Sequence, residues 1–189
     1  SPHQAAKRRV SHSLAAWGMT EVLSYPFVSA SDNEMFGDSS NPGVPLENAL
    51  DSLVNRMRVS LIPGLLSVAH RNYSRGFTSL ALFEAGLVFE SGDGVGTSDI
   101  PAGGVKPDEQ ALSRLYASVP SQPWFIGGVF LGPAIEKSPG LRSQESDIRD
   151  ALDAVRVSFE ALDAPYEIHQ DSHPAFHPGR CGRIVVHGV

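Results

Sequence analysis

The sequence predicts an α+β domain, and two kinds of pattern carry this prediction. Apolar residues recur at the spacing of amphipathic helices over residues 2–17, 61–75 and 146–162. Apolar and β-branched runs indicate strands near residues 20–29, 80–90, 122–131, 165–171 and 182–188. The chain has 189 residues, of which 41% are hydrophobic. This length and composition favour a single domain over residues 1–189 with its own core.

The first helix is predicted from its apolar face, which is formed by Ala6, Val10, Leu14 and Trp17. Ser1 is a candidate cap and Gly18 a stop signal. The basic cluster 7–9 fits either an ordinary solvated face or an RNA contact. The strand over 20–29 must contain a bulge or lie at a sheet edge, because Pro26 has no N–H to donate. Residues 31–48 have the composition of a loop.

Residues 53–90 organise the rest of the chain, since they predict a helix, a turn and a buried strand in succession. Ser60 is a candidate cap for the helix, Pro63 fits its first turn, and Gly76 ends it. Glycine disfavours a helix, so Gly64 suggests that another backbone, or the adjoining strand, approaches too closely for a methyl group. The strand 80–90 is almost wholly apolar, which is typical of a strand covered on both faces.

Glu84 is the exceptional residue of this strand, because a buried carboxylate must be paired or hydrogen-bonded. Backbone amides or an arginine of the preceding helix could hold it. The alternative is a role in ligand binding.

The next segment has no sign of a phosphate loop. Residues 91–104 are rich in glycine and predict a flexible, hairpin-like excursion. Glycines 92, 94 and 96 do not open a helix, and the next helical candidate, residues 108–117, lies beyond two prolines. Residues 123–132 predict a strand near the centre of the sheet, and its paired glycines 127 and 128 suggest close approach by another backbone.

The helix over 146–162 has the clearest helical signal, with Ser146 as its candidate cap. Its apolar stripe consists of Ile148, Leu152, Val155, Phe159 and Leu162. This stripe could pack on the domain's own sheet or contact another subunit.

Three histidines lie four residues apart at positions 169, 173 and 177, a spacing that invites a metal site on a helix. Pro174 and Pro178 exclude the helix, so no metal site is predicted. A turn at Pro178 would present Arg180 to clamp a carboxylate or phosphate, or to pair with Glu84 or a helix terminus. Arg180, Glu84 and His177 are therefore candidate ligand or interface contacts, and no catalytic residue is predicted.

The overall charge limits the function. A formal net charge of −6 argues against binding nucleic acid by electrostatics alone. The single cysteine, Cys181, excludes an internal disulfide and fits a reducing compartment, so cytoplasm is expected. No apolar run suits a membrane span. The chain starts in a helical pattern and stops in a strand pattern, which suggests a piece of a longer protein.

Several stretches together resemble the beta subunit of bacterial phenylalanyl-tRNA synthetases. These are residues 57–66 with Asn72 and Arg75, then 82–89, 18–28, 46–48 and 177–180. Together they span nearly the whole chain. In the family, the Asn at position 48 is usually followed by Pro, whereas this chain has Ala49.

The resemblance implies a class II synthetase-like, mainly antiparallel sheet in a catalytic-like but non-catalytic module. It implies a partner alpha subunit that joins phenylalanine to tRNA with ATP and Mg²⁺, in a two-alpha, two-beta assembly. Class II catalytic domains hold the ATP α-phosphate with an arginine on the strand equivalent to 80–90, and this strand has none. The fragment is therefore expected to bind no cofactor and to be inactive alone. The alternative is an independent RNA-binding or protein-interaction module.

Overall fold

The computed structural model describes residues 1–37, 41–92, 95–96, 101 and 103–186. The chain divides into two compact units. Unit 1 comprises Ser1–Tyr25, Leu61–Gly86 and Phe125–Val189, and unit 2 comprises Pro26–Ser60 and Leu87–Trp124. In the described part of the chain, every helix is too short or too polar to traverse a bilayer.

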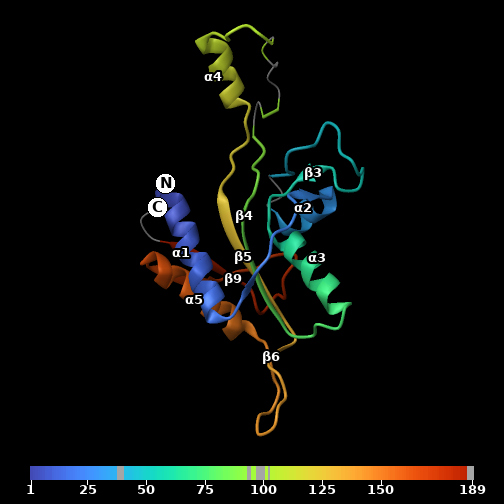
Figure 1. Ribbon diagram of the computed structural model, residues 1–189, viewed down its shortest axis with the longest axis vertical. Coiled ribbons are helices and arrows are strands. Elements are labelled where there is room, and N and C mark those ends of the chain that lie inside the picture. Colours follow the sequence, from blue (N-terminus) through green and yellow to red (C-terminus); the bar gives the residue numbers. More distant parts are fainter. Residues whose placement is uncertain (38–40, 93–94, 97–100, 102, 187–189) are drawn as a thin grey trace. The chain divides into compact units, whose positions relative to one another are not determined.

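The core of unit 1 lies between two long helices and a central strand. Helix α1 (Pro2–Trp17) and helix α5 (Ile148–Leu162) lie side by side (Figure 1). Val10 and Leu14 of α1 pack with Met19 and with Phe83 of strand β4 (Leu80–Leu87), and α5 contributes Ala154, Val157, Ala161 and Leu162. Gly18 ends α1 as predicted, because its φ of 113° is a left-handed conformation that glycine adopts without strain.

The main sheet of unit 1 has the order β1-β4-β5. Its two long strands, β4 and β5, run side by side in Figure 1. Strand β1 (Thr20–Glu21) runs parallel to β4, with Thr20 opposite Leu82. Strand β5 (Trp124–Leu131) is the other neighbour of β4. The prediction that β5 is central was therefore wrong for the described residues, and β4 is the central strand. A Cβ on Gly128 would lie 3.3 Å from the carbonyl oxygen of Leu82, which explains the glycine in β5.

Two small antiparallel sheets complete the strands of unit 1. Strand β6 (Pro133–Ile135) pairs with β7 (Gln144–Glu145), and β8 (Tyr166–Gln170) pairs with β9 (Gly182–Val186). Tyr166 stacks on Phe159 of α5 with ring centroids 4.5 Å apart. These strands and helices, together with the mainly antiparallel pairing, agree with the predicted fold class.

Helix α3 (Ile62–Tyr73) confirms the predicted central helix but not its ends. Leu61, instead of Ser60, is the N-cap residue, and Ser74 is the C-cap residue, so Gly76 lies in the turn beyond the helix. Leu61, Leu65 and Ala69 are buried on one face. Helix α3 begins without a side-chain cap, so Ser60 is not needed at its start. Pro63 at N2 fits the first helical turn, where its missing N–H would have no partner within the helix.

The described residues of unit 2 form two short strands and two helices. Strands β2 (Phe27–Val28) and β3 (Arg56–Met57) pair antiparallel, and the helices are α2 (Ala30–Phe36) and α4 (Glu109–Ala117). Asp108 caps α4 by accepting a hydrogen bond from the N–H of Ala111 at 2.7 Å, which confirms the predicted helix. Half of residues 91–104, predicted as a flexible excursion, lie outside the described residues, and so does Gly94, one of the three glycines of the rejected phosphate loop.

Three further expectations were wrong. The strand predicted over 20–29 is two separate strands, β1 and β2, which pair with different partners. The loop predicted over 31–48 begins with helix α2, which Ser29 and Asp32 stabilise by a reciprocal capping box. Asp147, instead of Ser146, caps α5 through a second capping box. Of the predicted α5 stripe, Leu162 packs on the core together with Ala154 and Val157, whereas Ile148 and Leu152 are 49% and 39% exposed.

Candidate functional site

Glu84, a predicted contact residue, lies at the centre of unit 1. It belongs to β4, and its side chain is 0% exposed. The hydroxyl of Ser24 donates a hydrogen bond of 2.5 Å to Glu84 Oε2. A Cβ on Gly64 of α3 would collide with Ser24 Oγ and lie 3.0 Å from Ser24 Cβ. A close approach at Gly64 is therefore present, but the prediction that a backbone makes it was wrong: the approaching group is the side chain of Ser24, which binds the buried carboxylate.

Two buried polar residues of unit 2 were not singled out from the sequence. The amide of Asn33, 1% exposed, donates to the carbonyls of Met57 and Pro42 and accepts from the N–H of Val59. Arg58, 4% exposed, donates from Nε to the carbonyl of Leu87 at 2.8 Å. Both side chains bind backbone groups of unit 2: Asn33 bridges the end of β3 to the segments on either side of it, and Arg58 binds the last residue of β4. Only the three-residue spacing of Ser29 and Asp32 could have signalled the helix that carries Asn33.

Arg180 and His177 lie together in an exposed turn of unit 1. The N–H of Arg180 donates to the carbonyl of His177 at 2.9 Å, and the N–H of Gly179 donates to His177 Nδ1 at 3.1 Å. The hydrogen bonds from Arg149 hold the pKa of the Asp147 carboxyl below its usual value, and the positive charge of Arg180 contributes weakly. Two partners were predicted for Arg180, a helix terminus and Glu84. The charge of Arg180 acts on the N-terminus of α5, and Glu84 is buried in β4.

The three predicted histidines have separate surroundings. His169 lies 3.0 Å from Glu167 Oε2, and His173 packs on Phe176 with centroids 4.9 Å apart. His173 Nδ1 accepts from the N–H of Ala175, as His177 Nδ1 does from Gly179, so each His-Pro pair closes its own turn. In the described segments, no three His, Cys, Asp or Glu side chains are placed to hold a metal ion.

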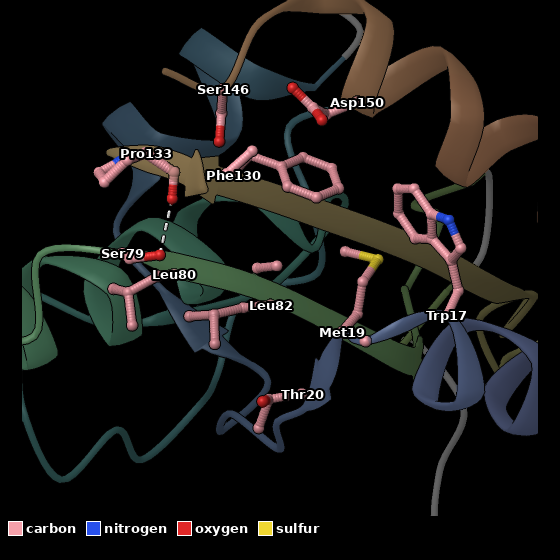
Figure 2. A pocket seen from close by; sticks show the side chains of 13 residues that line it. Trp17, Met19, Thr20, Ser79, Leu80, Leu82, Phe130, Pro133, Ser146 and Asp150 are labelled. Atoms are coloured by element: carbon pink, nitrogen blue, oxygen red, sulfur yellow. Dashed lines mark hydrogen bonds between the residues drawn. The ribbon is translucent and has the colours of Figure 1, made fainter. Parts of the chain in front are cut away.

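A pocket of about 450 Å³ lies entirely within unit 1 (Figure 2). Its apolar lining comes from the end of α1, from β4 and from β5: Trp17, Met19, Leu80, Leu82 and Phe130. The rings of Trp17 and Phe130 meet edge to face, with centroids 6.0 Å apart. Polar and apolar side chains share its walls about equally, and its volume lies in the range of small-molecule sites.

The polar groups of this pocket are hydroxyls and one carboxylate. The side of the pocket formed by the start of α5 contributes Ser146 and Asp150 (Figure 2). Ser79 Oγ already donates to the carbonyl of Pro133 at 2.7 Å. None of the lining residues is Lys, Arg or His. This site was not predicted from the sequence, because its lining comes from four separated segments without a shared motif.

The whole chain matches one protein family. A sequence profile described as phenylalanyl tRNA synthetase beta chain CLM domain matches residues 1–189. The chain is 40% identical over 186 residues to the phenylalanine–tRNA ligase beta subunit of Leifsonia xyli, covering 97% of this chain and 22% of that protein. It is 32% identical to that of Bifidobacterium longum, covering 100% of this chain and 23% of the relative. The chain thus spans about a fifth of the length of these relatives.

Solved structures share the fold at low sequence identity. A pyrrolysyl tRNA synthetase of Desulfitobacterium hafniense superimposes with a TM-score of 0.54 at 13% identity, covering 88% of this chain and 48% of that one. An ATP phosphoribosyltransferase regulatory subunit/histidyl-tRNA synthetase of Bacillus halodurans gives 0.53 at 8% identity, covering 88% and 35%. These likenesses establish a class II aminoacyl-tRNA synthetase-like fold. Together with the match over its full length, they show that the chain belongs to the family of phenylalanyl-tRNA synthetase beta-chain CLM domains, which are catalytic-like modules.

Proposed function

We propose that this chain is the catalytically silent module of a phenylalanine–tRNA ligase beta subunit, and that it supports an alpha subunit which performs the reaction. The assembly contains two alpha and two beta subunits in the cytoplasm and attaches phenylalanine to its tRNA with ATP and Mg²⁺. The family assignment and the beta-subunit relatives support this role. Positioning of tRNA in the assembly is part of the same proposal.

The observation that carries the silent role is the chemistry of β4. A polyphosphate site needs cations that neutralise its charge. Strand β4 carries neither Arg nor Lys, and its charged side chain is Glu84, which is fully buried and bound by Ser24. A carboxylate at this position would repel a phosphate. The residues of β4 therefore do not fit ATP, and the ATP of the whole enzyme is assigned to the alpha subunit.

The alternative of an independent RNA-binding module has less support. The net charge of −6 opposes a general attraction to phosphates. The match to the family over the whole chain also favours a part in ligation.

Co-purification tests the assembly. The tagged chain should retain untagged alpha subunit from the same species on an affinity column at moderate salt, whereas an unrelated class II domain of similar charge should not. Calorimetry of the chain alone with MgATP should show no binding. Tight, magnesium-dependent ATP binding would contradict the silent role, and failure to retain alpha subunit under any salt condition would contradict the supporting role.

A further inference from the structure

The pocket of unit 1 combines an aromatic wall with a single acidic group. Trp17 and Phe130 present their rings at one side of the space, and Met19 and Leu82 extend the apolar surface (Figure 2). A flat aromatic body would bury its faces against these side chains, and aromatic pairs gain stability beyond the area they bury. The pocket volume of about 450 Å³ is ample for one such ring with a short substituent.

The acidic group of this pocket is Asp150, the third residue of α5. Its Oδ2 accepts a hydrogen bond from the N–H of Asp147 at 2.7 Å, which fixes the carboxylate in place. Among the described residues, Asp150 Oδ1 accepts no recorded hydrogen bond and can receive one from a ligand. The neighbouring Arg149 points its guanidinium to Asp147, with contacts of 2.6 to 3.1 Å. The hydrogen bonds of the neighbouring Arg149 thus go to Asp147, and Arg149 acts on Asp150 only through its charge.

We propose that this pocket binds a small primary amine with an aromatic body. The ammonium donates to Asp150, and the ring lies against Trp17 and Phe130. Since no lining residue is Lys, Arg or His, the pocket offers a ligand carboxylate no cationic partner, and Asp150 would repel it. The pocket therefore selects an amine over an amino acid with the same ring. This inference goes beyond the proposed function and does not depend on it.

Four probes that share a phenyl ring test the charge preference in calorimetry of the 189-residue chain. These are phenethylamine, the neutral 2-phenylethanol, the zwitterion phenylalanine and the anion 3-phenylpropionate. Phenethylamine should bind roughly 10-fold more tightly than 2-phenylethanol, because one charge-assisted hydrogen bond separates them. Phenylalanine, which differs from phenethylamine only by its carboxylate, should bind at least ~10-fold more weakly than the amine. The anion should bind weakest.

Two variants of α5 locate the effect. Asp150→Asn keeps an oxygen for the N–H of Asp147 but removes the charge. The affinity for phenethylamine should therefore fall to that for 2-phenylethanol, and the affinity for 2-phenylethanol should not change. Asp153→Asn is the matched control, because Asp153 pairs with Arg156 and does not line the pocket. In NMR spectra, phenethylamine should shift the indole N–H of Trp17. Absence of saturable phenethylamine binding at millimolar concentration, equal binding by Asp150→Asn, or tighter binding of phenylalanine would each overturn the proposal.

Discussion

Replacing Gly64 by alanine separates close packing from helix propensity. In an exposed helix this change stabilises by about 1 kcal/mol. The backbone of Gly64 is helical and imposes no strain on alanine, so propensity alone would favour the variant. The new methyl group would, however, collide with Ser24 Oγ, which donates to the buried carboxylate of Glu84. Ser24 must move, and a hydrogen bond to a charged group contributes about 1.5 to 3 kcal/mol. The net expectation is a loss of roughly 1 to 2 kcal/mol.

The assay is urea unfolding of four proteins in a double-mutant cycle: parent, Gly64→Ala, Ser24→Gly and the double variant. Without the Ser24 side chain, the nearest atom to the new methyl group is Glu84 Oε2 at 3.9 Å, an ordinary contact. Gly64→Ala should therefore be neutral or stabilising in the Ser24→Gly background, with an interaction energy of about 1 to 3 kcal/mol. Gly64→Leu should be less stable than Gly64→Ala. If Gly64→Ala is more stable than the parent, the close-approach reasoning is refuted.

Three other predictions follow from buried or paired side chains. Leu65→Ala should lose about 2 to 5 kcal/mol in urea unfolding, because Leu65 is 0% exposed, whereas Leu66→Ala, at a position 41% exposed, should lose much less. Asn33→Ala should lose about 3 kcal/mol in the same assay, since it leaves buried backbone groups of unit 2 unpaired, and a loss below 1 kcal/mol would contradict this. The hydrogen bonds from Arg149 lower the pKa of Asp147, so their stabilisation is present above the ordinary carboxyl pKa and is lost as pH falls through the lowered value. Arg149→Ala should raise the pKa of Asp147 in an NMR titration; an unchanged pKa would disprove the assignment.

Long periodic segments were the most predictable parts of this fold. Helix α1 shows its apolar face and its terminal Gly18 directly in the sequence, and β4 shows a continuous apolar run. These signals are local, because one element provides both the pattern and the stop. The resemblance to the family added the antiparallel arrangement, which periodicity alone does not determine.

Short elements were missed because their signals were weak. Helix α2 covers seven residues and has little apolar periodicity, so only the spacing of Ser29 and Asp32 indicates it. Residues 20–29 look like one strand, but the pairing of Thr20 with β4 and of Phe27 with β3 splits them. Pro26, which has no N–H to donate, correctly indicated that the predicted strand is interrupted.

The candidate site was predictable only in part. The position of Glu84 within an apolar strand predicted that its side chain is buried and hydrogen-bonded. It did not predict the partner, Ser24, which lies 60 positions earlier. The roles of Arg180, His177 and Glu84 as ligand or interface contacts stay predictions. The pocket depends on tertiary structure, since Trp17 and Asp150 line it together only because α1 and α5 pack against each other.

Pyrophosphate exchange tests the central claim most directly. The chain alone, supplied with phenylalanine, MgATP and labelled pyrophosphate, should form no labelled ATP, because β4 offers a triphosphate no cation. The alpha–beta enzyme assayed in parallel should exchange and so validate the reagents. Phenylalanine-dependent exchange by the purified chain, at a rate that scales with its concentration and survives removal of traces of alpha subunit, would contradict a silent supporting module.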